Sequence, residues 1–470
     1  MEKPSDVIDR SREWETLARI HARDRAELVF VVGRRRVGKS YLLARFAEAA
    51  GGIYYQATRQ SESEQRASLA RRIGAHFGDE AVAAGASFGS WDNLFRYLTV
   101  KMGEQPLLLV IDEFPYLSEA SVPLTSVLQH YWDTQWQGSR LRLVLSGSYI
   151  TAMQQLEAHD QPLFGRRTAK LRIGPFTSRH VGAFVPSWSA RDRLLLYGLV
   201  GNLPGNLSLV DPSRSLAENI AELALDPGGR LVDEAEHILD AFVPNAEVHY
   251  AILDAIANGD QTWSALTSRV GRRGGSITRP LKWLEDMEIV ERVVPATDSD
   301  PARSKRALYR VTDPYIGFWH ALVAPLKRAG TVGMTDPMRI WEDLVAPRLD
   351  GYMGHVFEQM CREWVAESRQ PFPPVRLGSW WNARSQEEVD VVAVSSAGEL
   401  FVAECKWGRV TQRHLQTLQR RAPLVAGELA PPSRIHLGLF SGRGEFEDGV
   451  RAAADAGEVT LFGPEDVLGG

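Results

Sequence analysis

The chain has 470 residues, of which 44% are hydrophobic and 24% charged, and it carries a net charge of −5 at pH 7. This composition is typical of a soluble globular protein of two to four domains, and the negative total argues against a uniformly basic nucleic-acid coat. With Cys361 and Cys405 as its only cysteines, the chain has neither a disulfide framework nor a cysteine-rich zinc site, and its 11 histidines show no zinc-ligand spacing.

The amino-terminal segment, MEKPSDVIDRSREWETL, is polar and acidic and contains no apolar signal region. No run of about 18 apolar residues occurs further along the chain. The sequence therefore predicts a cytoplasmic protein without a membrane contact.

The first motif, GRRRVGKS at residues 33–40, follows the apolar run at residues 28–32 and precedes a helical pattern that begins at Tyr41. It satisfies the phosphate-binding pattern G-x-x-x-x-G-K-[ST]. Gly33 and Gly38 let backbone N–H groups surround phosphate, Lys39 reaches the β- and γ-phosphates, and Ser40 holds Mg²⁺. We include Tyr41 in this predicted ATP site. An ordinary basic turn is the alternative interpretation.

The second motif, PLLLVIDEF at residues 106–114, is an apolar strand that ends in two acids. Asp112 is placed to complete the magnesium shell, and Glu113, pointing to the other side, is placed to polarise the attacking water. Another buried strand, residues 141–145, leads to Ser148, where a polar side chain could sense the γ-phosphate. The two motifs together predict binding and hydrolysis of ATP.

Further strands and helices alternate around these motifs. Residues 53–56 read as a strand, and residues 62–77 and 91–101 read as helices. The alternation predicts an α/β fold with a doubly wound parallel sheet.

Several segments together resemble the archaeal and bacterial AAA+-like ATPases of the STAND class, from Val7 to Leu209. These segments are IDRSREWETLARI, GRRRVGKSYLL, LLLVIDEFPYL, LVLSGSYITAM, PLFGRRTAKLRIGPF and YGLVGNLPGNL. The resemblance implies a P-loop core followed by a helical lid, with Lys39 and Ser40 as Walker A and Asp112 and Glu113 as Walker B.

The same resemblance makes Ser148 a sensor-like position and places Arg166, in FGRR, near the nucleotide. A solvated loop arginine is the alternative interpretation of Arg166. The family's Gly-Gly-x-Pro step stands here as Gly201-Asn202-Leu203-Pro204, with asparagine for the second glycine. The asparagine therefore stands at a position where, in the family, the helical lid contacts the nucleotide.

Residues 250–311 predict three helices followed by two strands, which is the order of a winged helix-turn-helix. On the third helix Ile277, Leu281 and Leu284 form the inward stripe. A basic face results, made of Arg272, Arg273, Arg279, Lys282, Arg303, Lys305 and Arg306. This face predicts DNA contact, and a packing or autoinhibitory module is the alternative.

The carboxyl-terminal third contains a β-hairpin, EEVDVVAVSSAGELFVAECKWGRV, preceded by the helical segment HVFEQMCREWV with Glu358. If the hairpin pairs symmetrically about Ala397, Asp390 faces Glu404 on one side of the sheet. Opposed carboxylates repel unless a cation joins them, and Mg²⁺ or Mn²⁺ prefers oxygen ligands. Lys406 shares the face of Glu404.

The pattern Asp…Glu-x-Lys after a helical Glu resembles the PD-(D/E)XK nuclease superfamily. The resemblance implies that Asp390, Glu404 and Glu358 hold the metal and that Lys406 orients or activates water. Lysine stands at only eight positions in this arginine-rich chain, which favours a required ammonium at Lys406. A nuclease-like fold without activity and an ordinary amphipathic hairpin are the alternatives.

Three neighbouring features of this segment receive secondary interpretations. Glu388 is a further outer acid. Cys405 points to the opposite face as a core residue, and Trp380 and Trp381 favour core packing over base stacking.

We therefore predict four parts: a P-loop ATPase core at residues 1–175, a helical lid at 176–240, a winged helix at 241–325 and a PD-(D/E)XK nuclease-like domain at 326–470. The first functional hypothesis is an ATPase that regulates metal-dependent cleavage of DNA. The second is a STAND-type signalling switch whose last domain only binds nucleic acid or a protein partner and which opens into homo-oligomers. A DNA motor ranks last, because no further helicase motifs are present.

Overall fold

The computed structural model describes residues 1–148, 150–240, 243, 246–270, 277–383 and 386–469. The chain divides into two compact units, Met1–Pro175 and Phe176–Gly470. Within the described ranges, no helix combines the length and the apolar character needed to span a membrane.

The first unit contains a five-stranded sheet with the order β2-β3-β4-β1-β5, and all its neighbouring strands are parallel. The strands are β1 (Glu27–Val32), β2 (Ile53–Gln56), β3 (Leu107–Asp112), β4 (Leu141–Gly147) and β5 (Ala169–Arg172). β1 and β3 are buried along their whole length, because helices cover both faces of the sheet, and this is why they read as continuous apolar runs.

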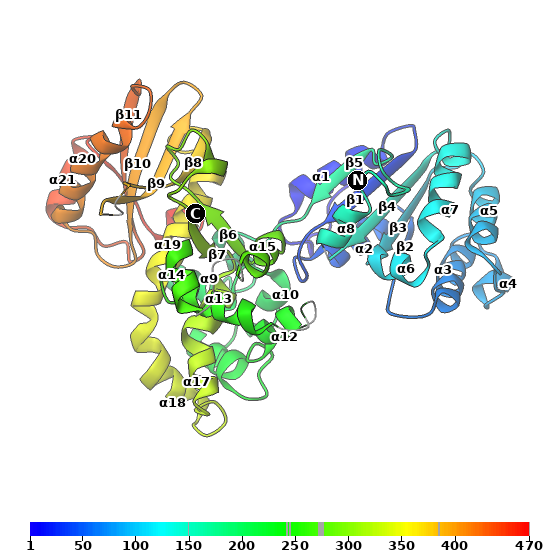
Figure 1. Ribbon diagram of the computed structural model, residues 1–470, viewed down its shortest axis with the longest axis horizontal. Helices are drawn as coiled ribbons and strands as arrows, with labels where there is room; N and C mark the ends of the chain where they lie inside the picture. Colours follow the sequence, from blue (N-terminus) through cyan, green and yellow to red (C-terminus); the bar gives the residue numbers. More distant parts are fainter. Residues whose placement is uncertain (149, 241–242, 244–245, 271–276, 384–385, 470) are drawn as a thin grey trace. The chain divides into compact units, whose positions relative to one another are not determined.

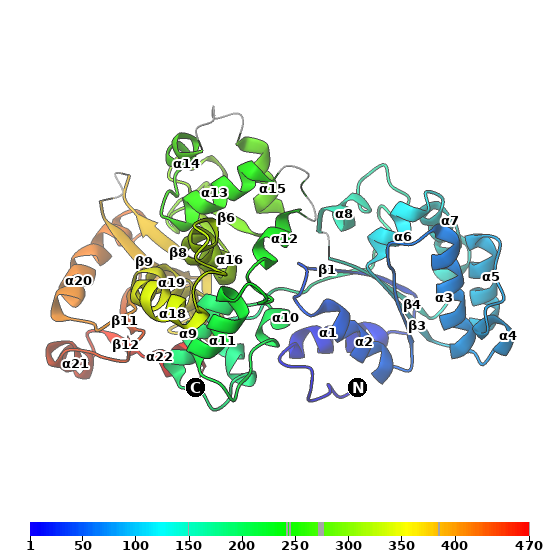
Figure 2. The ribbon, with the colours of Figure 1, turned by 90° about the horizontal axis from the view of Figure 1, so that it is seen from below.

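Figure 2 shows α1 and α2 on one side of this sheet and α3, α5 and α7 on the other. The helices are α1 (Ser11–His21), α2 (Lys39–Ala49), α3 (Glu62–His76), α4 (Glu80–Ala83), α5 (Trp91–Met102), α6 (Phe114–Ala120), α7 (Leu124–Tyr131) and α8 (Ile150–Gln155). The predicted α/β fold with a parallel sheet is confirmed for this unit. Since β1, β3 and β4 are adjacent, the loops that follow them meet at one edge.

The second unit begins with helices. They are α9 (Ala190–Val200), α10 (Pro204–Leu207), α11 (Leu216–Ile220) and α12 (Glu234–Asp240). Then come α13 (Glu247–Ala257), α14 (Trp263–Arg269) and α15 (Thr278–Asp286), and the antiparallel pair β6 (Val290–Val293) and β7 (Leu308–Val311). The elements follow one another in the predicted order of three helices and two strands.

The predicted stripe of α15 is confirmed, because Ile277, Leu281 and Leu284 are buried. Packing within the second unit removes Arg306 from the predicted basic face. Arg306 donates to the carbonyl of Trp381 and to Glu428, both further along the second unit, and is therefore a packing residue. Arg272 and Arg273 lie outside the described residues.

The rest of the second unit surrounds a second five-stranded sheet with the order β12-β11-β10-β9-β8. The strands are β8 (Pro374–Trp381), β9 (Glu388–Ser395), β10 (Glu399–Lys406), β11 (Arg434–Ser441) and β12 (Thr460–Phe462). The helices are α16 (Pro314–Phe318), α17 (Ala324–Arg328), α18 (Pro337–Ile340), α19 (Leu349–Ser368), α20 (Gln412–Gly427), α21 (Asp448–Asp455) and α22 (Pro464–Val467). Figure 1 shows α19 on one side of this sheet and α20 and α21 on the other.

The predicted hairpin register is confirmed: Leu400 pairs with Val394 and Val402 with Val392 in an antiparallel ladder. Leu400 and Val402 pack with the apolar residues of α20. Cys405 contacts Cys361 of α19 and is buried, as expected of a core residue on the opposite face. Trp380 and Trp381 are also buried, which excludes base stacking by either ring.

Candidate functional site

The loop between β1 and α2 has the backbone that phosphate binding requires. A Cβ atom at Gly33 would lie 2.3 Å from the carbonyl oxygen of Ile173, so only glycine fits there. Gly38, at φ 88°, and Arg36, at φ 68°, adopt left-handed conformations that curl the loop. The N–H groups of the first turn of α2 follow directly, and they form an anion-binding terminus.

Lys39, Ser148 and Glu113 form one hydrogen-bonded chain at this edge of the sheet. The Lys39 ammonium donates to the carbonyls of Gly33 and Arg34, at 2.8 Å each, and to Ser148 Oγ at 2.9 Å. Ser148 donates its hydroxyl to Glu113 Oε1 and its backbone N–H to Glu113 Oε2. Burial lowers the pKa of Lys39 to about 8, although Glu113 and Asp112 oppose the shift. The structure thus brings these three predicted residues together.

Glu113 has φ 52°, a left-handed conformation that is strained in a residue with a side chain. The turn follows β3 directly, and it sends the Glu113 side chain to Ser148 while Asp112 stays buried in the strand. The two adjacent acids are therefore separated into different environments.

The donors around Asp112 fit a magnesium ion. Asp112 accepts hydrogen bonds from its neighbour's N–H at 3.0 Å and from the Tyr54 hydroxyl at 2.9 Å. Tyr54 also interacts with Ser40, so Ser40 and Asp112 share the Tyr54 hydroxyl as a partner. A hydroxyl and a carboxylate are the donors that Mg²⁺ takes in P-loop sites.

Arg10, whose role the sequence did not reveal, fastens the loop. This buried side chain donates to the carbonyls of Val37, at 2.9 Å, and Gly174, at 2.8 Å. Tyr41 is half exposed and donates to Asp6 at 2.7 Å, so it also contacts the amino-terminal segment. Both contacts come from the amino-terminal segment that precedes the motif. The sequence does not show that this segment packs on the phosphate loop, because only the tertiary fold brings the two together.

Arg166 does not join this group. It pairs with Asp133, Nη2 to Oδ2 2.7 Å, and precedes Thr168, which bonds Leu28 at the start of β1. The phosphate loop follows the end of β1, so the two lie at opposite edges of a parallel sheet. The structure thus separates Arg166 from the nucleotide loop of its own chain.

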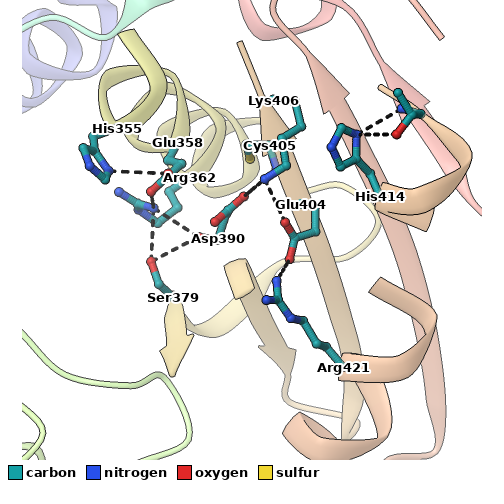
Figure 3. A network of polar contacts seen from close by, with 11 residues as sticks. His355, Glu358, Arg362, Ser379, Asp390, Glu404, Cys405, Lys406, His414 and Arg421 are labelled. Carbon is teal, nitrogen blue, oxygen red and sulfur yellow. Dashed lines mark hydrogen bonds and ion pairs between the residues drawn. The ribbon is translucent and has the colours of Figure 1, made fainter. Parts of the chain in front are cut away.

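The second cluster lies at the ends of β9 and β10, where Lys406 joins two carboxylates (Figure 3). Lys406 Nζ lies 3.0 Å from Glu404 Oε2 and 3.7 Å from Asp390 Oδ2. Asp390 also accepts the N–H of Cys405 at 2.7 Å. Burial and the carboxylates of Glu358 and Glu404 raise the pKa of Asp390 to about 7. Burial lowers the pKa of Lys406, but the two acids outweigh it and raise that pKa above its usual value.

A second cation, Arg421 of α20, lies on the other side of Glu404. Its guanidinium is 2.8 Å from Glu404 Oε1 and 2.8 Å from Glu387 Oε2. Arg420 and Arg421 lower the pKa of Glu387 to about 2. The sequence did not reveal Arg421, because nothing local marks one arginine of a polar helix as a partner of Glu404.

Glu358 lies near enough to Asp390 to help raise its pKa, but its own ion-pair partners are on α19. It lies 3.6 Å from His355 and 3.8 Å from Arg362. The described residues contain no group of three or more His, Cys, Asp or Glu side chains placed to hold one metal ion. The physical reason is that α19 covers the face of the sheet that carries Cys405, whereas Glu404 faces Arg421 of α20. Asp390 and Glu404 therefore provide two oxygen donors, a number that Mg²⁺ accepts when substrate phosphate completes the shell.

Comparisons with known proteins match two separate parts of the chain to two different families. Residues 7–210 match a family described as an ATPase domain predominantly from Archaea, and residues 319–418 match a family of archaeal and bacterial proteins of unknown function. The first part of the chain thus has a P-loop ATPase-like fold and is similar to this ATPase family, for which ATP and Mg²⁺ are the expected ligands.

One curated relative and two solved structures are also similar. The uncharacterized protein MJECL04 of Methanocaldococcus jannaschii is 27% identical over 426 residues, which cover 88% of this chain and 90% of that protein. The Walker-type ATPase PABY2304 of Pyrococcus abyssi matches with a TM-score of 0.51 at 20% identity over 68% of this chain and 97% of its own, and it shows the fold. The ORC2 protein of Aeropyrum pernix matches with a TM-score of 0.42 at 17% identity over 70% and 96%.

Proposed function

We propose that the protein is a regulatory ATPase that couples binding and hydrolysis of ATP to a metal-dependent, nuclease-like domain acting on DNA. The observation that carries the ATPase half is the hydrogen-bonded chain from Lys39 through Ser148 to Glu113. It links the side chain that binds the β- and γ-phosphates to the carboxylate that polarises water.

Each residue of the first site has a definite task in this proposal. The loop N–H groups and Lys39 bind the phosphates, Ser40 and Asp112 hold Mg²⁺, and Glu113 accepts a proton from the attacking water. Bound Mg²⁺ neutralises charge on the β- and γ-phosphates. Ser148 is placed to orient Glu113 and to contact the γ-phosphate.

Exchange of Glu113 for glutamine tests the ATPase half. Glu113→Gln keeps the size of the side chain and one acceptor oxygen for Ser148 but removes the base. ATP binding should persist while kcat falls by about 100-fold or more. Lys39→Ala should lose binding itself, and Glu104→Gln, an exposed acid, is the matched control. Unchanged hydrolysis in Glu113→Gln would remove Glu113 from the mechanism.

The nuclease half depends on the Asp390, Glu404 and Lys406 cluster. Asp390 and Glu404 would hold the metal, Lys406 would orient the attacking water, and a bound divalent ion would polarise the phosphodiester. We assign Glu358 a supporting electrostatic role instead of direct ligation, since it lies on the α19 side. The three helices and two strands at residues 247–311 are proposed as a winged helix that contacts DNA through Arg279 and Lys305, both exposed.

A second candidate is a STAND-type switch whose last domain binds a partner without cleavage. The observation that favours it is the position of Arg421 and Lys406, which already neutralise Glu404 without a metal ion. In this case ATP would drive opening into homo-oligomers, and the carboxylates would serve structure.

Plasmid nicking with Mn²⁺ or Mg²⁺ separates the two candidates. The wild type is compared with Lys406→Ala and with Lys170→Ala, an exposed lysine of β5, in the presence of ATP, ADP or neither. Cleavage that is lost only in Lys406→Ala supports the nuclease. No cleavage by the wild type in any nucleotide state favours the switch, and light scattering with ATP then tests for assembly.

A further inference from the structure

A cavity of about 390 Å³ lies between α19 and the β6–β7 segment of the second unit and adjoins the Asp390 cluster at Glu358 and Arg362. Its wall on α19 is formed by Arg348, His355, Glu358 and Arg362, whose spacing places them on one face of the helix. Arg310 of β7 lines the facing wall. The cavity is thus built from two parts of the chain that are distant in sequence.

Two guanidinium groups that line this cavity, those of Arg310 and Arg362, share a single hydroxyl partner, Ser379. Arg310 donates to Ser379 Oγ at 3.3 Å, and Arg362 donates to the same atom at 3.1 Å. Arg362 also donates to the carbonyl of Asp390 at 3.0 Å (Figure 3). Within the described chain, neither group has a carboxylate oxygen closer than 3.8 Å.

Neighbouring like charges of this kind are costly. Burial, followed by the proximity of Arg362, lowers the pKa of Arg310, although Glu358 and Glu291 lie near enough to oppose the shift. A guanidinium has five donors and cannot lose its proton in a protein. Among the described residues Arg310 hydrogen-bonds to Ser379 and its guanidinium lies 6.0 Å from the centre of the Trp381 ring, so donors remain for a further acceptor. An anion with several oxygen atoms would satisfy both groups at once.

The remainder of the cavity suits an apolar or aromatic moiety. Its lining includes Ile256, Val311, Pro314, Leu322 and Val356 beside the polar wall. Cavities of about 300–1,000 Å³ that combine apolar walls with a few convergent polar groups are typical of small-molecule sites. A ligand that carries both an anionic head and a planar ring fits a cavity with one cationic wall and one apolar wall.

We propose that this cavity binds a nucleotide phosphoester, with the phosphate between Arg310 and Arg362 and the base against the apolar wall. Two forks that approach from separate elements suit a tetrahedral phosphate with oxygens in several directions better than a planar carboxylate. The phosphoester is either a free mononucleotide or the terminal nucleotide of a polynucleotide. The site requires neither metal nor cleavage, so it goes beyond the proposed function.

The test measures binding to the full chain by calorimetry with two probes, AMP and a 5′-phosphorylated single-stranded deoxydecanucleotide. A P-loop recognises the β- and γ-phosphates, so AMP is a poor ligand for it, and Lys39→Ala removes its contribution. Arg310→Met and Arg362→Met should each weaken binding by about tenfold or more. Arg376→Met, an exposed arginine of β8, is the matched control.

Arg310→Lys and Arg362→Lys are included because a lysine keeps the charge and its packing while losing the planar fork. Either lysine variant should keep the thermal midpoint of the wild type and still bind several-fold more weakly. Binding of AMP alone identifies a free nucleotide, and binding of the oligonucleotide alone identifies a strand end. The proposal is overturned if neither probe binds below millimolar concentration, if binding disappears in Lys39→Ala, or if the arginine variants and Arg376→Met bind alike.

Discussion

Glu363 of α19 is the group whose titration should be visible in the stability of the second unit. Its carboxylate accepts hydrogen bonds from the hydroxyl of Tyr197 in α9 at 2.9 Å and from Gln359 at 2.9 Å. Burial raises its pKa from 4.5 to about 7, while these two hydrogen bonds and Arg362 oppose the shift and Glu367 adds to it. The group therefore joins α9 to α19 as an acid that titrates near neutrality.

The direction of the effect follows from proton linkage. Between pH 4.5 and about 7 the folded protein binds more protons at Glu363 than the unfolded chain, so stability falls as pH rises through this interval. The full shift corresponds to at most about 3 kcal/mol, and residual solvent contact of the partly buried side chain reduces it. Below the unfolded pKa the penalty is absent, and above pH 7 it is complete.

The substitution that tests this reasoning is Glu363→Gln, which keeps a carbonyl acceptor for Tyr197 and removes the proton exchange. Thermal unfolding of the full chain is followed for the wild type, this variant and Glu367→Gln at pH 5, 7 and 8.5. We expect equal midpoints near pH 5 and a midpoint several degrees higher for Glu363→Gln at pH 8.5. A difference that is the same at all three pH values, or that favours the wild type at pH 8.5, would refute the raised pKa.

Three further predictions concern the nucleotide site. Gly33→Ala should lose ATP binding by at least about tenfold, because its Cβ would collide with Ile173, whereas Gly89→Ala has open space and should bind normally. Arg10→Met removes two hydrogen bonds to carbonyls, one buried and one partly buried, so the unfolding free energy of the first unit should fall by about 2–4 kcal/mol in denaturant titrations. No loss would show that Arg10 does not fasten the loop. Ser148→Ala should lower kcat for ATP by about 10- to 100-fold with little change in ATP affinity, and equal kcat values would leave Ser148 without a role in orienting Glu113.

The sequence predicted those parts of the sites that local patterns determine. The phosphate loop is predictable because its glycines and Lys39 occur at fixed spacing after an apolar strand. The hairpin register is predictable because alternation and the turn about Ala397 leave one pairing that keeps Leu400 and Val402 on the same side as Val392 and Val394.

Other parts depend on which surfaces pack together, and local patterns do not contain this information. Glu358 lies on an amphipathic helix as predicted, but the sequence does not say which face of the sheet that helix covers. α19 packs on the Cys405 face, so Glu358 approaches Arg362 instead of Glu404. Likewise Arg306 and Arg310 belong to a basic segment by sequence, yet the packing of that segment against β8 makes them partly buried partners of Trp381 and Ser379.

Lys39 and Glu113 share Ser148 as a hydrogen-bond partner, so a nucleotide that binds at Lys39 is expected to affect the carboxylate of Glu113. Ser148 cannot keep its present contacts to both and also orient a phosphate, because one hydroxyl supplies a single hydrogen. A γ-phosphate that accepts the hydroxyl hydrogen of Ser148 would take it from Glu113 Oε1, whereas the backbone N–H of Ser148 can still hold Glu113 Oε2. ATP would replace hydrogen bonds within the protein instead of only adding new ones. Its affinity should therefore be lower than the number of its contacts with the protein suggests. We expect the backbone N–H of Ser148 to keep Glu113 oriented while Glu113 Oε1 becomes free to accept from water, so that hydrolysis is limited to the loaded site.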